Sequence, residues 1–335
     1  MKKLAIGVDI GGINTAFGLV DENGDLYAES VISTKKYPYV DDYPAYVRDL
    51  CDAMHAMAKS LSFDYELTGI GIGAPNANYH KGTVETPANL WKFRDGDPNP
   101  DESRRIFPLA SDISNCFSGV KTLITNDANA ATIGEMIYGN AKGMKDFIMI
   151  TLGTGLGSGF VANGEMIYGD DGFAGEFGHI PFFDNEIICS CGKKGCLETE
   201  VSGIAIEDKM RHMIEKGVNT ILKKQYDEQR TVHIDDIINA AMNDDNLSIE
   251  LIEEAGEKVG KAIAFLINTF NPETVIVGGN LAAAGDYLML PLKSATNKYS
   301  LNLVYKDTKF RVSKMTESAN AWGVAMLIRN KVIGI

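Results

Sequence analysis

Residues 4–24 read LAIGVDIGGINTAFGLVDENG, and this stretch decides the fold that the sequence predicts. An apolar strand ends at Asp9, a turn follows at Gly11-Gly12, and a second strand leads to Asn23-Gly24, a strong hairpin signal. Apolar residues at helical spacing come next. The elements expected here are strands at 4–8, 16–20 and 26–33, a helix at 41–61 and a strand at 68–73. Their order is β-β-β-α-β.

A similar order recurs in the middle of the chain. An apolar strand at 147–152 meets a glycine turn at 153–157, a second strand follows at 158–162, and Asn163-Gly164 repeats the hairpin signal. Coincidence between two glycine-rich hairpins is the alternative, but strand, turn, strand and Asn-Gly follow the same order in both. We therefore expect one supersecondary unit used twice, once in each of two α/β domains.

The rest of the chain adds further strands and helices. A helix at 248–270 takes Ser248 as its N-cap and ends before Pro272. The stretch at 219–232 is polar and unpatterned, so we interpret it as a surface connection. The other expected elements are strands at 122–125 and 274–277 and helices at 128–138 and 319–329.

The segment 175–198, GEFGHIPFFDNEIICSCGKKGCLE, contains a complete set of zinc ligands. Cys189, Cys191 and Cys196 follow His179 within one glycine-rich loop. Three thiolates and one imidazole fill a tetrahedral site, so the predicted zinc is structural and leaves no position for a catalytic water. Chance clustering of buried cysteines is the alternative, but this spacing favours zinc.

Composition and the other two cysteines bear on the class of protein. Cys51 and Cys116 lie in helical-looking stretches and are expected to be small core residues, not part of a disulfide framework. A reduced, cytoplasmic protein is therefore expected. The formal charge of -13, from 32 Lys and Arg against 45 Asp and Glu, argues against a nucleic-acid or anionic-membrane surface. No segment approaches the length of a membrane span.

Three glycine turns follow strands, at 9–15, 153–157 and 278–279. Main-chain amides in such turns can hold phosphate oxygens, which favours a nucleotide in a cleft between the domains. Asp9 ends a strand and is a candidate for holding Mg²⁺ through water, with a turn aspartate as the alternative. Asp127 follows a strand and starts a helix, so it is interpreted as a helix cap, as a general base kept ionised by the helix N-terminus, or as both.

Together these residues resemble the ROK family of bacterial sugar kinases and repressors, within the hexokinase–actin superfamily. The matching motifs fall in family order and cover nearly the whole chain. They are VDIGGINTAFG (8–18), GIGAP (71–75), NLW (89–91), TNDANAATIGE (125–135), GTGLGSG (153–159), GEFGHI (175–180), CSCGKKGCLE (189–198) and VIVGG (275–279).

The resemblance implies two RNase H-like α/β domains around a central cleft, one formed by residues 1–125 with 318–335 and the other by 126–317. Asp127 would be the catalytic base that takes the proton of the sugar hydroxyl. His179 would use one nitrogen for zinc and the other for sugar. The sugar would be bound by Asn89, Asn126, Asp127, Glu176, His179 and Glu198. ATP and Mg²⁺ would be bound by Asp9, Gly11, Gly12, Thr15, Gly153, Thr154, Gly155 and Gly279.

Two positions depart from the family pattern. Ile13 stands where the family usually has Thr, which removes one hydroxyl near the phosphates, and Thr15 is expected to substitute for it. The family's GxPG is GAPN at 73–76 here, and the following loop at 77–82 differs further. That loop lies near the sugar in relatives, so the identity of the sugar stays open at this point.

The expected function is that of an ATP-dependent hexose kinase that phosphorylates glucose at O6. The alternatives are an N-acetylhexosamine kinase acting on N-acetylglucosamine or N-acetylmannosamine, and a non-catalytic sugar sensor, which Ile13 keeps open. A repressor is disfavoured, because the first strand begins at residue 4 and leaves no room for an N-terminal helix-turn-helix, and because the charge is wrong for DNA. The resemblance also implies a homodimer or a higher homo-oligomer.

Overall fold

The computed structural model describes residues 1–87 and 90–313, which divide into two compact units. Unit 1 includes helix α3 (Asp127–Ile137), whereas the sequence predicts a second domain that starts at residue 126. Compact units need not coincide with domains, so the predicted domain bounds stay a prediction. The described residues of unit 1 are 1–87, 90–143 and 166–174, and those of unit 2 are 144–165 and 175–313.

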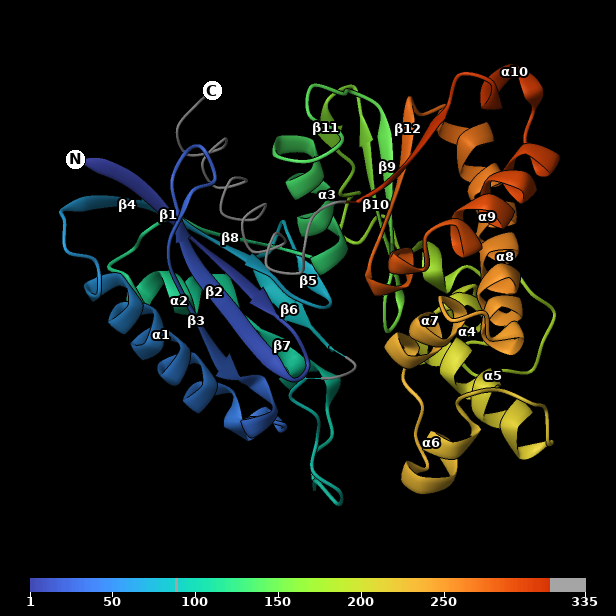
Figure 1. Cartoon of the computed structure of the whole chain (residues 1–335). Helices are drawn as coiled ribbons and strands as arrows, with labels where there is room; N and C mark the ends of the chain where they lie inside the picture. Colours follow the sequence, from blue (N-terminus) through green and yellow to red (C-terminus); the bar gives the residue numbers. More distant parts are fainter. Residues whose placement is uncertain (88–89, 314–335) are drawn as a thin grey trace. The chain divides into compact units, whose positions relative to one another are not determined.

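Unit 1 is built on a five-stranded sheet with the strand order β3-β2-β1-β4-β8 (Figure 1). The first three strands of the chain pair antiparallel, because the predicted turns at Gly11-Gly12 and Asn23-Gly24 join them directly. β1 then pairs parallel with β4, and β4 with β8, through longer connections. The strands are β1 (Lys2–Ile10), β2 (Asn14–Val20), β3 (Leu26–Ser33), β4 (Tyr65–Gly73) and β8 (Thr122–Thr125).

Helix α1 (Tyr43–Lys59) packs on this sheet and closes the apolar core of unit 1. Leu50 and Met54 of the helix are fully buried, as are Ile6 and Ile72 of the strands. The helix was predicted from apolar residues at helical spacing, and burial of that stripe is what stabilises it. The remaining elements of unit 1 are α2 (Leu109–Cys116), α3, β5 (Ala77–Asn78), β6 (Thr83–Glu85) and β7 (Ile106–Phe107).

Unit 2 repeats the sheet of unit 1, with the strand order β11-β10-β9-β12-β13 (Figure 1). β9 and β10 form the antiparallel hairpin, and β9 pairs parallel with β12, which pairs parallel with β13. This agreement confirms the supersecondary unit that the sequence predicts to occur twice. The strands are β9 (Phe147–Leu152), β10 (Leu156–Ala162), β11 (Glu165–Met166), β12 (Thr274–Gly278) and β13 (Lys309–Val312).

The helices of unit 2 include a closely packed pair, α8 and α9, which lie side by side in Figure 1. Gly256 and Gly260 permit the approach, because a Cβ atom there would lie 2.6 Å and 2.2 Å from main-chain oxygens of α9. Among the described residues, no helix is long and apolar enough to cross a membrane. The helices are α4 (Glu198–Val201), α5 (Gly203–Glu215), α6 (Lys223–Gln229), α7 (Ile234–Ala241), α8 (Asn246–Phe270), α9 (Asp286–Tyr299) and α10 (Asn302–Tyr305).

Two predictions about the helical part are wrong in detail. The N-cap of α8 is Asp245 and not Ser248, because the Asp245 carboxylate accepts hydrogen bonds from the amide of Ser248 (3.0 Å) and from its hydroxyl (2.6 Å). The stretch at 219–232 is not merely a connection, since it contains α6. The helix predicted at 319–329 lies outside the described residues.

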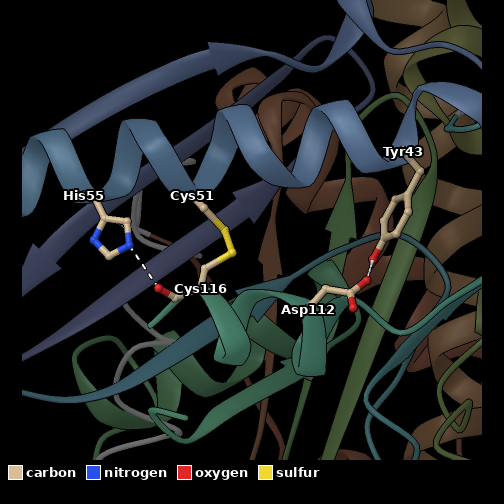
Figure 2. Close-up of a disulfide and its surroundings, with 5 residues drawn as sticks. All are labelled: Tyr43, Cys51, His55, Asp112 and Cys116. Atoms are coloured by element: carbon tan, nitrogen blue, oxygen red, sulfur yellow. Dashed lines mark hydrogen bonds between the residues drawn. A yellow bond between two sulfur atoms is a disulfide. The ribbon is translucent and has the colours of Figure 1, made fainter. Parts of the chain in front are cut away.

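The prediction for Cys51 and Cys116 is also wrong, because the two residues form a disulfide between α1 and the end of α2 (Figure 2). Their Cα atoms lie 6.2 Å apart, within the range for a disulfide. Next to the bridge, the His55 ring donates to the main-chain oxygen of Cys116 (3.1 Å) and stacks on Phe117. At the start of α1, the Tyr43 hydroxyl donates to Asp112 of α2 (2.7 Å), and burial raises the pKa of Tyr43. The two helices are thus joined at the start and at the middle of α1.

Loss of this disulfide is expected to destabilise unit 1. It closes a chain separation of 65 residues, for which the loop-entropy model gives about 4 kcal/mol, or roughly 8–16 °C in melting temperature. The measurement is thermal melting with and without a phosphine reductant, compared with the Cys51→Ala/Cys116→Ala double variant. The variant should melt low under both conditions, and an unchanged melting temperature in the variant would exclude a stabilising role.

Candidate functional site

Four predicted metal ligands come together in unit 2. The ligand atoms of His179, Cys189, Cys191 and Cys196 all lie within 4.8 Å of one another. His179 Nδ1 is 3.4 Å from Cys189 Sγ, and the sulfurs of Cys191 and Cys196 are 3.6 Å apart. Zn–S bonds of about 2.3 Å at tetrahedral angles place sulfurs about 3.8 Å apart. The number, type and spacing of these donors fit Zn²⁺.

Glycines allow the chain to close around this cluster. Gly195 has φ +74°, and a Cβ atom there would lie 2.1 Å from the main-chain oxygen of Phe183. Gly178, next to His179, approaches the main-chain oxygen of Leu156, where a Cβ atom would lie 2.5 Å away. Because any side chain at these two positions would displace the backbone, the metal-ligand loop depends on glycine as the sequence predicts.

The thiols of the cluster are chemically suited to a cation. Burial raises the pKa of Cys189, and it raises that of Cys196 to about 12, so both would hold their protons if no positive charge were near. A divalent ion displaces those protons and makes the thiolates its ligands. A divalent metal ion would therefore supply the positive charge that these thiolates require.

Glu176, His179 and Glu198 gather beside the cluster, as the sequence predicts. His179 Nε2 faces Glu176 Oε2 at 3.8 Å, while its Nδ1 faces the sulfurs. Glu198 Oε2 accepts a hydrogen bond from the amide of Leu156 (2.9 Å), and its Oε1 lies 3.8 Å from Cys189 Sγ. The two nitrogens of His179 thus have different surroundings, which suits one to the metal and the other to a ligand.

The predicted phosphate-binding turn of unit 2 adjoins these carboxylates. Gly155 lies against Glu198, where a Cβ atom would be 2.5 Å from Oε2. The amide of Gly153 donates to the Gly155 oxygen (3.0 Å), and its own oxygen accepts from Gly203 at the start of α5 (2.7 Å). Thr154, between the two glycines, is exposed. The turn is therefore held in place by α5, the helix that begins at Gly203.

Gly279 meets the same turn from strand β12. It has φ +84°, and a Cβ atom there would lie 2.2 Å from the oxygen of Leu152, the residue before the turn. The next residue, Asn280, has a buried side-chain oxygen without a hydrogen-bond partner in the described part of the chain, close to Gly153. An acceptor of this kind suits a ligand group with donors. The sequence signal for Asn280 was its place directly after the glycine pair.

In unit 1, Asp9 and Asp127 lie at the same edge of the sheet. Asp9 is in register with Gly73 of β4, and Gly73 with Thr125 of β8, the strand that leads to Asp127. Two strand spacings separate β1 from β8, or roughly 10 Å. Because carboxyl ends of parallel strands share an edge, both carboxylates can serve one site.

Asn126 is the N-cap of α3, and Asp127 is its first residue. The amide of Ala128 donates to the side chains of both Asn126 (2.7 Å) and Asp127 (2.8 Å). Asp127 is exposed, and its position in the first helical turn favours the ionised carboxylate. Asn89, predicted to contact the sugar, lies outside the described residues.

Two further polar residues, missed by sequence reasoning, lie two positions before and two positions after Asp127 in the chain. The Thr125 hydroxyl and the Asn129 side-chain oxygen are buried, and neither has a hydrogen-bond partner in residues 1–87 and 90–313. Their only sequence signal was their place within TNDANAA, where alternating polar residues flank Asp127. Unsatisfied groups of this kind suit a site that receives a polar ligand.

The turn after β1 is exposed at Gly12 and Ile13, but Thr15 is fully buried. The Thr15 hydroxyl is bonded to those of Thr34 (2.8 Å) and Tyr46 (2.9 Å) in the core. This environment argues against Thr15 as the substitute for the hydroxyl missing at Ile13, because its side chain points away from solvent. We therefore attribute any phosphate contact of this turn to its main-chain amides.

Comparison with known proteins finds both kinases and regulators. The model of the ROK family matches residues 5–331. The glucokinase of Halalkalibacterium halodurans is 31% identical over 335 residues, which cover 97% of this chain and 95% of that protein. The xylose repressor of Caldicellulosiruptor bescii is 30% identical over 96% of this chain and 77% of its own length. A ROK family glucokinase from Streptomyces griseus, solved in complex with glucose and AMPPNP, superposes with a TM-score of 0.78 at 28% identity, covering 98% of this chain and 99% of that one.

Proposed function

Starting from the fact that this chain belongs to the ROK family, we propose that it is an ATP-dependent hexose kinase that phosphorylates glucose at O6. The observation that carries the proposal is the exposed Asp127 carboxylate at the first turn of α3, on the sheet edge that also carries Asp9. A sugar hydroxyl must lose its proton as the phosphoryl group arrives, and a positioned carboxylate can accept it.

The remaining residues have supporting roles in this proposal. Asn89, Asn126, Glu176, His179 and Glu198 hydrogen-bond the sugar, and Asp127 accepts the proton of its O6 hydroxyl. Asp9 orients Mg²⁺ through water. Bound ATP supplies the phosphoryl group, and Mg²⁺ offsets the negative charge of the phosphates. The nucleotide is held by amides of Gly11, Gly12, Gly153, Thr154 and Gly155, with Gly279 beside it.

The zinc ion has a structural role in the proposal. His179, Cys189, Cys191 and Cys196 hold it, and all four ligand positions are used by protein. The ion fixes the loop from which Glu176 and His179 reach the sugar. A homodimer or higher homo-oligomer completes the proposal, which rests there on the family alone. The cytoplasmic location expected from reduced cysteines loses that support, because Cys51 and Cys116 form a disulfide.

Two other functions have support. The loop at 77–82 departs from the family pattern, which keeps an N-acetylglucosamine or N-acetylmannosamine kinase in view. The similarity to a xylose repressor favours a non-catalytic sugar sensor as the candidate from another class.

The test is a coupled assay of ADP release with ATP and Mg²⁺ over a panel of sugars. The panel contains glucose, mannose, xylose, N-acetylglucosamine and N-acetylmannosamine. The highest kcat/KM is expected with glucose, and a higher value with an N-acetylhexosamine would move the substrate to that class. Sugar binding by calorimetry without ADP release from any member of the panel would identify a sensor.

A further inference from the structure

Helix α4 carries Glu198 at its first position and Glu200 two residues later. The Glu200 side chain is only 12% exposed, and its carboxylate belongs to a group of four charged residues. This group, the Glu200 cluster, consists of Glu200 (α4), Lys209 (α5), Glu254 (α8) and Lys258 (α8). None of the four is part of the site described above.

Glu200 lies at the centre of the cluster. Its Oε2 accepts hydrogen bonds from Lys209 Nζ (3.0 Å) and Lys258 Nζ (2.6 Å), and its Oε1 accepts one from Asn185 Nδ2 (2.6 Å). Lys209 also donates to the main-chain oxygen of Glu200 (3.3 Å). Glu254 Oε1 accepts from the same two lysines, at 3.2 Å and 2.5 Å. The two positive and two negative charges are therefore balanced.

The cluster joins α4 to the metal-ligand loop as well as to two helices. Asn185 lies in that loop, between His179 and Cys189. Lys258 also lies over the ring of Phe183 at 5.4 Å, and the amide of Phe183 donates to the Gly195 oxygen (3.1 Å). Glu200 is thus the one carboxylate of the cluster that contacts α5, α8 and the loop that would hold zinc.

Helix α4 needs such support, because it consists of four residues and has no side-chain hydrogen bond at its N-cap. A single helical turn is not stable by itself, since nucleation costs more than one hydrogen bond returns. The Glu198 carboxylate accepts hydrogen bonds from the Leu156 amide (2.9 Å) and from Cys189 Sγ (3.8 Å), and neither donor lies on α4. The direction of the Glu198 carboxylate therefore depends on how α4 is held.

We propose that Glu200 is a positioning residue, which fixes α4 and the metal-ligand loop so that Glu198 and His179 present their polar atoms to the sugar. This inference rests on the proposed function, because Glu198 and His179 are sugar contacts only there. Glu200 itself touches neither substrate nor metal. Because a buried ion pair is weak evidence for net stability, we assign the Glu200 cluster a role in fixing geometry as part of the same proposal.

The test compares Glu200→Gln with Glu254→Gln as its matched control. Both changes remove one negative charge from the same two lysines, but Glu254 lies on α8, and among the described residues it accepts hydrogen bonds from Lys209 of α5 and Lys258 of α8. Glu200→Gln removes the charge that holds both lysines, and we expect it to weaken glucose binding about 10–100-fold, by analogy with the loss of activity when residues that orient metal ligands are replaced. The KM for ATP should stay unchanged in both variants. Glu254→Gln should keep wild-type glucose affinity.

Zinc release to a chelator gives a second readout that does not depend on sugar. Glu200→Gln should release zinc faster than Glu254→Gln. Asn185→Ala leaves all four charges in place and should also release zinc faster than Glu254→Gln. This variant replaces Glu200→Gln in the test if Glu200→Gln does not fold. Equal glucose affinity and equal zinc release in the Glu200 and Glu254 variants would overturn the proposal.

Glu198→Gln separates this proposal from the proposed function. If wild-type protein binds no hexose, or if Glu198→Gln binds glucose as wild type does, the assignment of the sugar site fails. If Glu198→Gln weakens glucose binding and Glu200→Gln changes neither readout relative to its control, only the positioning role fails.

Discussion

Replacing Asp127 by Asn is expected to lower kcat by about 10²–10⁴-fold, the contribution of a positioned general base. The amide keeps the size of the carboxylate and can still hydrogen-bond a sugar hydroxyl, but it cannot take up the proton. Glucose affinity should therefore change much less than turnover. The measurement combines steady-state kinetics with equilibrium binding of glucose.

In this structure, Asp127→Asn changes the proton-accepting group without removing the N-cap of α3. Because Asn126 and not Asp127 is the N-cap of α3, the helix keeps its capping hydrogen bond to the Ala128 amide in the variant. An unchanged melting temperature is the control for folding. Near wild-type turnover with the best sugar would show that Asp127 is only a polar residue at a helix start.

The second large effect is expected from Cys191→Ser. Serine is a poor zinc ligand, and a Cys₃His site that loses one thiolate should fall from about one ion per chain to a small fraction of that. Glucose affinity should fall with the metal, because Glu176 and His179 lie on the loop that the ion closes. Metal analysis and glucose binding on the same preparation provide the measurement.

Cys116→Ser is the matched control for this change. It also removes one thiol, but from the disulfide with Cys51 in unit 1. It should lower the melting temperature and keep about one zinc per chain. A zinc-free Cys191→Ser protein that binds glucose like wild type would separate the metal from the sugar site.

The sheets could be predicted from the sequence because their signals are local. In each sheet a glycine turn joins the first two strands and an Asn-Gly pair joins the second to the third, and the bounds predicted for β3, β8 and β9 agree with the structure. The metal cluster was predictable for the same reason, since all four ligands lie within eighteen residues of one chain segment, from His179 to Cys196. Short-range sequence patterns therefore predicted both the hairpins of the sheets and the metal cluster of unit 2.

Long-range pairings could not be predicted in this way. Cys51 and Cys116 each read as a core thiol, because their meeting depends on how α1 and α2 pack across 65 residues. Thr15 reads as a turn hydroxyl, but alternation along β2 directs it into the core towards Tyr46. The Glu200 cluster was missed because its charges come from three separate helices.

The most direct test of the central claim is the identity of the reaction product. Wild-type protein is incubated with ATP, Mg²⁺ and ¹³C-labelled glucose, and the products are followed by ³¹P and ¹³C NMR. Glucose 6-phosphate should form in equal amount to ADP, and its rate of formation should fall about 10²–10⁴-fold with Asp127→Asn. ADP without a sugar phosphate, or bound glucose that is never phosphorylated, would contradict a hexose kinase.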